Sequence, residues 1–307
     1  MPELSVVIVT YNSRETIEGC LRSLERQTIE PAQIVVVDSG QDGAADIVAA
    51  LFPRVELLRF PDRRYPGDAR NIGVGHASGN LVAFLDSDCI ADPHWAAEIL
   101  AAHQRPDPII GGAVDNATSG SAVAWARYFS EFSRWMPSAA GGHMRDVPTC
   151  SMSMKLWAFE RFGPFLEGTY CSDTAFCWRA GDAGYPPLFH PAIRVSHITP
   201  TRLGAFFKKQ TKHGKAFAKV RIREKRLSRW QTTLLFLGSP ALPFLLFGRL
   251  IGRMLRSRRS VPAFVSASPF VLAGIIAWSW GEALGYAACL RIGGWSKGAP
   301  KPMEHPA

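Results

Sequence analysis

Residues 84–88 read FLDSD, and this short stretch directs the interpretation of the chain. The apolar residues that lead into it predict a strand, with Asp86 and Asp88 at its carboxyl end. Side chains two residues apart on an extended backbone point the same way, so both carboxylates can face one ligand. Converging anions repel each other unless a cation lies between them, and Mg²⁺ and Mn²⁺ prefer oxygen ligands shared with substrate phosphates. The pattern predicts a metal-bridged diphosphate, although Asp-x-Asp also arises in surface turns.

Strands and helices alternate around this stretch. The β-branched runs at 5–10 and 34–38 are typical of strands covered on both faces in a parallel sheet. The pattern further predicts helices at 13–27, 42–52 and 69–76 and strands at 55–60 and 81–86. Such alternation favours a right-handed parallel α/β layer that binds ligands at the carboxyl ends of its strands. Polar residues stand at those ends: Tyr11, Asn12, Asp38, Ser39, Asp86 and Asp88.

Three further helices are predicted beyond the first sheet strands. One spans 93–104, with Asp92 as its N-cap and a proline in its first turn. Another lies near 154–161, and a short one runs from Asp173 to Ala180 before a glycine stop. We expect residues 115–147 to be less regular.

Charge is unevenly distributed along the 307 residues. Residues 1–201 contain 16 Lys or Arg and 23 Asp or Glu, whereas residues 202–307 contain 19 basic and three acidic residues. A basic tail indicates an anionic partner, either an acidic membrane surface or a nucleic acid. With 47% apolar residues the chain can bury a full core, as one large domain or as a domain with an appendage.

The six cysteines and the N-terminus bear on the cellular compartment. The cysteines form no CxxC pair, so we expect them to be reduced and mostly buried. The N-terminal MPELSVVIVTYN has no basic segment and no cleavage site, and its apolar run is too short for a signal peptide. We therefore expect the first part of the chain to be cytoplasmic.

The tail predicts contact with a membrane. Residues 202–229 contain eleven basic residues and one acid, with apolar residues at three- and four-residue intervals, as in an amphipathic surface helix. Residues 230–248 and 260–281 carry no charge, and each is long enough to cross a bilayer core. The expected units are a catalytic domain at 1–201, a basic interfacial helix at 202–229 and a membrane-associated helical tail at 230–307.

The topology of the tail does not follow from hydropathy alone. A full crossing by 230–248 would place the arginines at 249–259 on the side opposite the basic helix, against the positive-inside bias. Pro240 and Pro243 interrupt this segment. We expect a broken or re-entrant element that returns to the cytoplasmic side, with 260–290 either spanning or forming a second hairpin.

The motifs taken together resemble family 2 glycosyltransferases, which have the GT-A fold, a Rossmann-like and mostly parallel α/β sheet flanked by helices. The resemblance covers about residues 4–200, and only a subset of the family shares the membrane tail. It is carried by six elements in the family's order: SVVIVTYN, VVVDSG, PGDARNIG, FLDSD, SDTAFCWR and finally His197.

The resemblance implies where a nucleotide-sugar donor binds. Tyr11 and Asp38 match residues that hold the base, since an aromatic face can stack on uracil and a carboxylate can accept from its N–H. Thr10 and Asn12, which flank Tyr11, are assigned to the same site. The alternatives are a tyrosine at the edge of the core and, for Asp38, a helix N-cap.

Phosphate, ribose and metal contacts are implied in the same way. Arg70 and Asn71 match an element beside the donor, where a guanidinium can meet a phosphate or position Asp86; the alternative is a surface ion pair. Asp86 matches the ribose-side and Asp88 the metal-side carboxylate of the DXD motif, and both are assigned to Mn²⁺ or Mg²⁺. His197 matches a position that supplies a further metal ligand in some members, and a core histidine is the alternative.

Asp173 matches the catalytic acid of the family's Glu-Asp pair. In an inverting displacement one carboxylate takes the acceptor's proton while a metal stabilises the departing nucleoside diphosphate. Here Ser172 replaces the usual glutamate. This departure leaves the base in place and removes a neighbouring charge.

The resulting hypothesis is an inverting, metal-dependent glycosyltransferase at the cytoplasmic membrane face. Its acceptor would be a hydroxyl or phosphate, either lipid-linked or on a cell-envelope polysaccharide, next to an anionic membrane. One alternative is a non-catalytic protein that uses the basic tail to bind nucleic acid or a membrane. The two uncharged segments of membrane length argue against binding to nucleic acid. Another alternative, a sugar nucleotidyltransferase, would need a glycine-rich loop that TYNSRE lacks.

Overall fold

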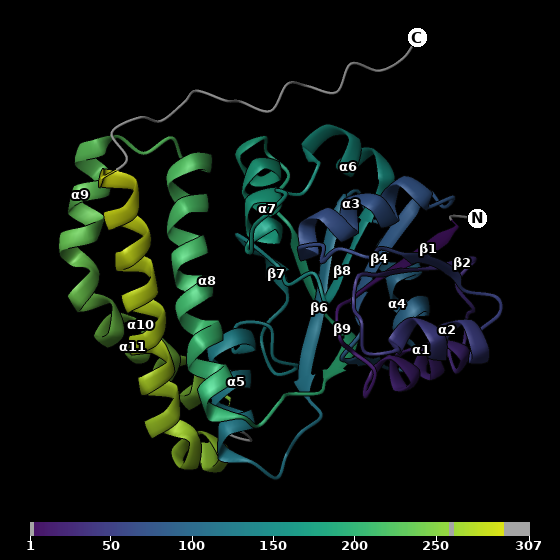
Figure 1. The fold of residues 1–307 in the computed structure, drawn as a ribbon, viewed down its shortest axis with the longest axis horizontal. Helices are drawn as coiled ribbons and strands as arrows, with labels where there is room; N and C mark the ends of the chain where they lie inside the picture. Colours follow the sequence, from purple (N-terminus) through teal and green to yellow (C-terminus); the bar gives the residue numbers. More distant parts are fainter. Residues whose placement is uncertain (1–2, 258–260, 292–307) are drawn as a thin grey trace.

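The computed structural model describes residues 3–257 and 261–291. Within these residues one mixed sheet has the order β3-β2-β1-β4-β8-β6-β9-β5, with β7 paired to β9 (Figure 1). Its strands are β1 (Leu4–Thr10), β2 (Gln33–Asp38), β3 (Glu56–Arg59), β4 (Leu81–Asp86), β5 (Cys89–Ala91), β6 (Ile109–Asn116), β7 (Gly142–His143), β8 (Ser151–Lys155) and β9 (Leu188–His197).

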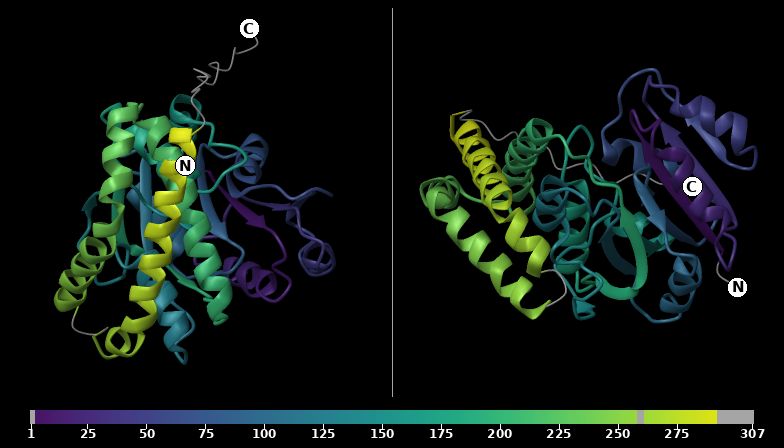
Figure 2. Two further views of the ribbon diagram at one scale, coloured as in Figure 1. Left: turned by 60° about the vertical axis from the view of Figure 1, so that its left-hand side comes forward. Right: turned by 90° about the horizontal axis from the view of Figure 1, so that it is seen from below.

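Helices cover both faces of this sheet, and a group of long helices lies along one side (Figure 2). The helices of the sheet layers are α1 (Ile17–Glu25), α2 (Ala44–Leu51), α3 (Pro66–His76), α4 (Trp95–Ala102), α5 (Ala122–Phe132), α6 (Leu156–Phe162) and α7 (Ser172–Asp182). The long group consists of α8 (Leu203–Glu224), α9 (Arg229–Gly238), the 3₁₀ turn η1 (Ser239–Ala241), α10 (Leu242–Arg256) and α11 (Val261–Arg291).

The β3-β2-β1-β4 half of the sheet is parallel, as the sequence predicts. Strand β1 lies between β2 and β4, and its β-branched residues are buried on both faces. Helix α3 packs directly on β1 because Gly73 has no side chain: a Cβ there would lie 2.3 Å from Cγ1 of Val7. The carboxyl ends of β1, β2 and β4 therefore meet at one edge, where Asp38 and Asp86 stand.

The other half of the sheet differs from the expectation in its details. Strand β8 joins β4 in antiparallel orientation, and β6 and β9 continue the sheet beyond it. The region 115–147 is not irregular throughout, because it contains α5, whose N-cap Ser121 accepts from the backbone N–H of Ala124. Helix α4 begins at Trp95 and not at 93, since Asp92 accepts from the N–H of His94 and so forms a turn before the helix.

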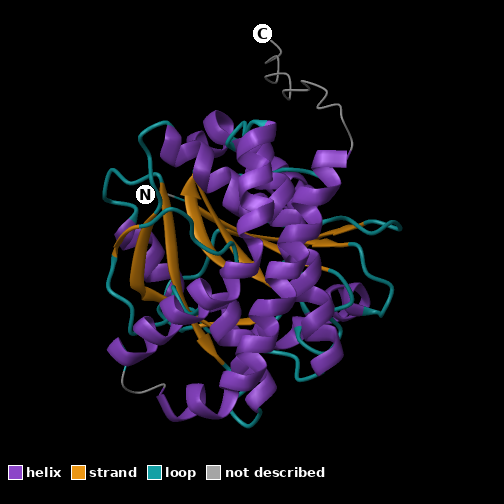
Figure 3. Ribbon diagram, turned by 90° about the vertical axis from the view of Figure 1, so that its left-hand side faces the viewer, coloured by secondary structure: helices purple, strands orange, loops and turns teal. Residues whose placement is uncertain are grey.

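Helix α8 packs along α11, and both belong to the group that covers one side of the sheet in Figure 3. Close contact is possible because Gly214 and Gly281 carry no side chain: a Cβ on Gly281 would lie 2.1 Å from the carbonyl oxygen of Thr211. A buried polar network also joins the two helices, since the Tyr286 hydroxyl donates to Glu282 at 2.6 Å and Arg221 donates to Tyr286 at 3.2 Å.

The proline-containing segment is interrupted, as expected, but the chain does not turn back within it. Turn η1 interrupts it, and α9 and α10 then form one 28-residue helical path from Arg229 to Arg256. The chain reverses only after Arg256, and α11 returns beside this path (Figure 1). Both Arg229–Arg256 and Val261–Arg291 are long and apolar enough to cross a membrane. The parts of the predicted membrane-associated tail at residues 258–260 and 292–307 lie outside the residues that the structure describes.

The cysteines agree with the sequence analysis. All six are free, and Cys20, Cys89, Cys150 and Cys177 are buried. The fold therefore does not depend on disulfide bonds.

Candidate active site

Asp38 lies at the carboxyl end of β2, beside Thr10 at the end of β1. It is 4% exposed. Burial raises the pKa of its carboxyl, and the N–H of Gly40, which donates to it at 3.3 Å, acts in the opposite direction. A cavity of about 420 Å³ adjoins Asp38 and is also lined by Arg59 and Phe60. Its size is typical of a small-ligand site.

Tyr11 and Asn12 follow β1 at the same edge. The Tyr11 ring is 44% exposed, and the Arg63 guanidinium lies 4.4 Å from its centroid. Asn12 has a φ of 56°, and its Oδ1 accepts from the N–H of Gln41 at 3.0 Å. The Asn12 side chain thus holds the loop after β2 close to the end of β1, next to the Asp38 cavity.

Arg70 and Asp86 form a partly buried ion pair. The Arg70 Nη2 donates to Asp86 Oδ1 at 2.7 Å, and the guanidinium side chain is only 6% exposed. Asn71 is directed elsewhere: its amide donates to the Phe165 carbonyl at 3.0 Å, and its Oδ1 accepts from the Phe165 N–H at 2.9 Å. Asn71 therefore fastens the segment before α7 to α3.

Asp88 and His197 come together from the turn after β4 and the end of β9. Their Oδ2 and Nε2 atoms are 3.3 Å apart, and with the Cys89 thiol they form a cluster whose ligand atoms lie within 4.8 Å of one another. Burial lowers the pKa of His197, but the Asp88 carboxylate outweighs this effect and raises it above its usual value. Burial also raises the pKa of Cys89, so its thiol stays protonated.

An oxygen and an imidazole nitrogen are a donor set that suits Mn²⁺ and, less well, Mg²⁺. Asp88 and His197 would hold such an ion. Asp86 is not part of this cluster in the described residues, because its Oδ1 is turned to Arg70.

Asp173 is the second residue of α7 and is half-buried. Its Oδ1 accepts from the N–H of Thr174 at 2.8 Å. Burial raises the pKa of the Asp173 carboxyl; Arg70 opposes this, and Asp146 and Asp86 reinforce it. Helix α7 contacts α3, the helix that carries Arg70, and Arg70 in turn pairs with Asp86. The start of α7 therefore lies on the side of the sheet where β4 ends.

Ser172, which stands where the family has a glutamate, is packed inside the protein. It is 2% exposed and faces the start of α3, where a Cβ on Gly67 would lie 3.0 Å from the serine Oγ. A longer side chain at position 172 has no open space on this side.

Comparison with known proteins identifies the family. The sequence profile of glycosyl transferase family 2 matches residues 5–162, about half of the chain. The chain belongs to this family. A glycosyltransferase of Haloferax volcanii, AglE, is 29% identical over 229 residues, which is 72% of this chain and 74% of AglE. The succinoglycan biosynthesis protein ExoO of Rhizobium meliloti is 39% identical over 95 residues, 30% of this chain and 27% of that protein.

Solved structures confirm the GT-A fold of this family 2 member. The mannosyltransferase PcManGT from Pyrobaculum calidifontis, solved with GDP-Man and Mn²⁺, superposes with a TM-score of 0.60 at 19% identity and covers 96% of this chain and 76% of its own. GalNAc-T7, solved with UDP, GalNAc and Mn²⁺, gives 0.53 at 17% identity, covering 74% and 52%.

Sequence reasoning missed two residues of this glycosyltransferase site. Arg63, in the loop after β3, contacts Tyr11 and donates to the Tyr170 hydroxyl at 2.9 Å. Asp146 is buried, pairs with Arg134 and acts on the charge of Asp173. Neither belongs to a motif. The two adjacent arginines in DRRYPGD are the one sequence feature that points to Arg63, and only weakly. No sequence feature points to Asp146.

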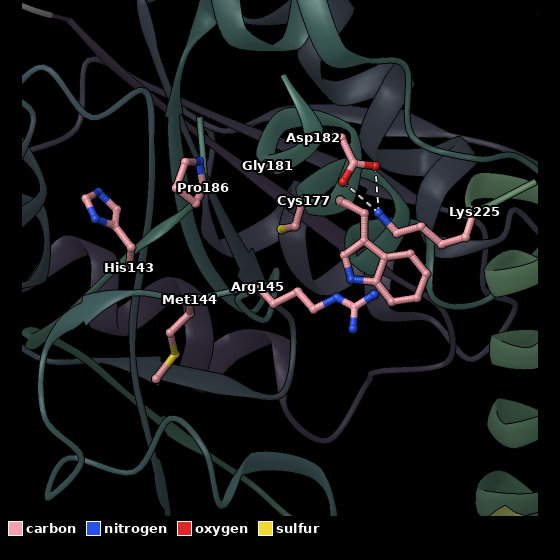
Figure 4. Close-up of a pocket in the computed structure, with 9 residues that line it drawn as sticks. His143, Met144, Arg145, Cys177, Gly181, Asp182, Pro186 and Lys225 are labelled. Carbon is pink, nitrogen blue, oxygen red and sulfur yellow. Dashed lines mark hydrogen bonds and ion pairs between the residues drawn. The ribbon is translucent and has the colours of Figure 1, made fainter. Parts of the chain in front are cut away.

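A second cavity lies at the carboxyl-terminal end of α7, as Figure 4 shows. It measures about 290 Å³ and is lined by His143, Arg145 and Trp178 among others. Lys225 and Asp182 form an ion pair of 2.6 Å beside it. The lining contains none of the residues that the family resemblance assigns to donor, metal or base, so it is separate from the site at the strand ends.

Proposed function

We propose that this family 2 glycosyltransferase moves a sugar from a nucleotide-diphosphate sugar to a hydroxyl or phosphate acceptor, with inversion at the anomeric carbon. The observation that carries the proposal is that the Asp88–His197 and Arg70–Asp86 pairs stand at one sheet edge, with Asp173 at the start of α7, which contacts the helix of Arg70. The two pairs and Asp173 each offer a different element of the chemistry: cation binding, neutralisation of negative charge and removal of a proton.

The donor is assigned to the edge formed by β1, β2 and β4. The Asp38 cavity, which Arg59 and Phe60 also line, takes the nucleobase. Thr10, Tyr11 and Asn12 follow one another at the neighbouring end of β1, and Asn12 accepts from the N–H of Gln41 in the cavity lining. The complexes of PcManGT with GDP-Man and of GalNAc-T7 with UDP, both with Mn²⁺, support a nucleoside diphosphate and a divalent ion here. The nucleotide and the sugar stay open.

Asp173 acts as the general base on the acceptor hydroxyl. The Arg70 guanidinium favours its ionised form and at the same time orients Asp86. Asn71 contributes by fixing the segment that leads into α7, so we assign it a positioning role. The cation on Asp88 and His197 would supply Lewis-acid stabilisation of the leaving diphosphate when bound.

Membrane association is assigned to the long helices, and the catalytic domain to the cytoplasmic face. Large apolar side chains are exposed along α9, α10 and α11, with Phe244 at 80% and Leu237 at 66%. Exposed lysines of α8 lie beside them, which suits an anionic lipid surface. A lipid-linked acceptor would be delivered there, and a polysaccharide is the other candidate. We keep the division into residues 1–201, 202–229 and 230–307 as part of this proposal.

The test is transfer itself. Purified full-length protein is incubated with labelled UDP-, GDP- and dTDP-sugars, Mn²⁺ or Mg²⁺ and a membrane lipid extract. We expect label to enter the lipid fraction from one donor class only. Asp173→Asn should lower the rate about 100- to 10,000-fold while nucleoside diphosphate still binds, because only proton removal is lost. Full turnover by Asp173→Asn would refute the assignment of the base.

A further inference from the structure

Arg127, on α5, is a buried cation for which the described residues provide no hydrogen bond and no ion pair. It is 6% exposed, and its Nε has no hydrogen-bond partner. Among residues 3–257 and 261–291 no carboxylate lies within 4.0 Å of its guanidinium. A buried charge without a partner is unfavourable, so its presence indicates a site for an anion.

Positive charge exceeds negative charge around Arg127. Glu131, one helical turn further along α5, is the acid nearest to it in sequence, and its Oε2 is already 2.9 Å from the Lys209 Nζ of α8. His213 lies one helical turn after Lys209. Burial, and to a smaller extent the positive charge of Lys209 and Arg127, lowers the pKa of His213 to about 4, while Glu131 acts in the opposite direction. Arg127, Lys209 and Glu131 are thus two cations and one carboxylate, and the Oε1 of that carboxylate has no hydrogen-bond partner among the described residues.

This cluster borders the reaction site. On one side the Phe132 ring lies 5.0 Å from the His197 ring, which contacts Asp88. On the other side the His213 ring stacks on Tyr170 at 4.6 Å, three residues before Asp173. An anion held by Arg127 and Lys209 would therefore lie between the cation ligands and the base, on the β6–β9 side of β4. The Asp38 cavity is at the ends of β2 and β3, on the opposite side.

We propose that Arg127 and Lys209 bind the phosphate of a phosphate-bearing acceptor whose apolar chain runs along α11. Helix α5 packs on α11, with Phe129 and Phe264 in edge-to-face contact at 5.5 Å, so the cluster is directly connected to the apolar helices. A guanidinium binds phosphate through two parallel hydrogen bonds, and Glu131 holds the Lys209 ammonium in place. The inference rests on the proposed transferase function and names its acceptor class.

Binding of farnesyl phosphate to the full-length protein in detergent tests this proposal, with farnesol and inorganic phosphate as separate probes. Arg127→Gln and Lys209→Gln should each weaken farnesyl phosphate binding about tenfold or more, and farnesol binding should not change. Arg127→Lys keeps the positive charge but cannot form two parallel hydrogen bonds, so it should weaken farnesyl phosphate binding less than Arg127→Gln does. Lys208→Gln is the matched control, because this neighbouring α8 lysine is exposed. The melting temperature of Arg127→Gln without ligand should fall only slightly, because no hydrogen bond is lost and Lys209 still pairs with Glu131.

A second arm distinguishes the acceptor phosphate from the donor diphosphate. UDP and GDP binding with Mn²⁺ should be equal in wild type and Arg127→Gln. Weaker nucleotide binding with unchanged farnesyl phosphate binding would overturn the proposal, because the anion would then be the leaving group. Equal binding of every probe by all variants would also overturn it. Wild-type protein that consumes no nucleotide sugar would instead refute the proposed function and leave the phosphate-binding result intact.

Discussion

At the scale of single residues, the proposed role of Asp173 as general base predicts how activity depends on pH. Burial and the nearby Asp146 and Asp86 raise the pKa of its carboxyl, while Arg70 lowers it. A general base must be ionised, so activity should fall as the pH decreases through this raised pKa. The acid limb of the kcat/KM profile should therefore lie above the value of an ordinary aspartate.

Asp146→Asn tests this charge coupling. Removing a neighbouring negative charge lowers the pKa of Asp173, so the acid limb should move to lower pH. Glu160→Gln, an exposed substitution on α6, should leave the profile unchanged. A shift in the opposite direction would mean that another group controls the acid limb.

Ser172 gives a second prediction at this scale. Because it is buried against the start of α3, Ser172→Glu should lower the free energy of unfolding by about 1–3 kcal/mol through overpacking and burial of a charge. Ser172→Ala is the control and should change stability little. Chemical denaturation measures both. A stable Ser172→Glu variant with higher activity would show that this position opens to the acceptor.

At the scale of elements, the α8–α11 contact depends on glycine. A Cβ on Gly281 would lie 2.1 Å from the Thr211 carbonyl, so Gly281→Ala should force the helices apart and lower the free energy of unfolding by about 1–3 kcal/mol. Gly252→Ala on α10 is the control, because nothing lies within 4 Å of that Cβ, and the higher helix propensity of Ala should stabilise by up to about 1 kcal/mol. Thermal unfolding of both variants in detergent compares them; equal melting temperatures would contradict the close packing.

The predictability of each element follows from its residues. Strands β1 and β2 are predictable from their β-branched runs and β4 from its apolar run LVAFLD, and these runs are buried. Helix α5 was missed although its apolar residues share one face, because the glycines, serines and aromatic residues of 115–147 favoured an irregular region. Strand β6 contains Gly111 and Gly112, which weaken its pattern.

Predictability of the site follows the same logic. Asp86, Asp88, Asp173 and His197 stand in motifs, so the family resemblance named them, and the structure pairs Asp88 with His197 at the edge where Asp86 ends β4. Arg63 and Asp146 reach the site only through folding of loops, and short-range patterns carry no information on such contacts. For Arg70 the family resemblance left two roles open, contact with a phosphate or positioning of Asp86. In the structure Arg70 pairs with Asp86.

At the scale of the whole molecule, the packing of α8 limits how α11 meets a membrane. Exposed lysines of α8, among them Lys212 and Lys215, would enter the hydrocarbon core if α11 crossed it, at about 2.5–3.5 kcal/mol each. We therefore favour α9, α10 and α11 embedded along the interface, with both ends of the α9–α10 path on the side of the catalytic domain.

Labelling of single cysteines in sealed membrane vesicles tests this arrangement. Trp230 and Leu255 are 68% and 69% exposed at the two ends of the α9–α10 path. With Cys171 and Cys289 replaced by Ala, Trp230→Cys and Leu255→Cys should react with a membrane-impermeant maleimide from the same side. Glu160→Cys on the catalytic domain marks that side. Reaction of the two positions from opposite sides would mean that the path spans the bilayer.

The central claim is that the reaction takes place where β4, β9 and α7 meet. Anomalous diffraction from a crystal of the protein with Mn²⁺ and a nucleoside diphosphate tests it most directly. We predict one manganese peak in contact with Asp88 and His197, with the diphosphate beside it. The nucleobase should lie in the Asp38 cavity. A manganese peak remote from Asp88, or a nucleotide bound away from the ends of β1 and β2, would contradict the account.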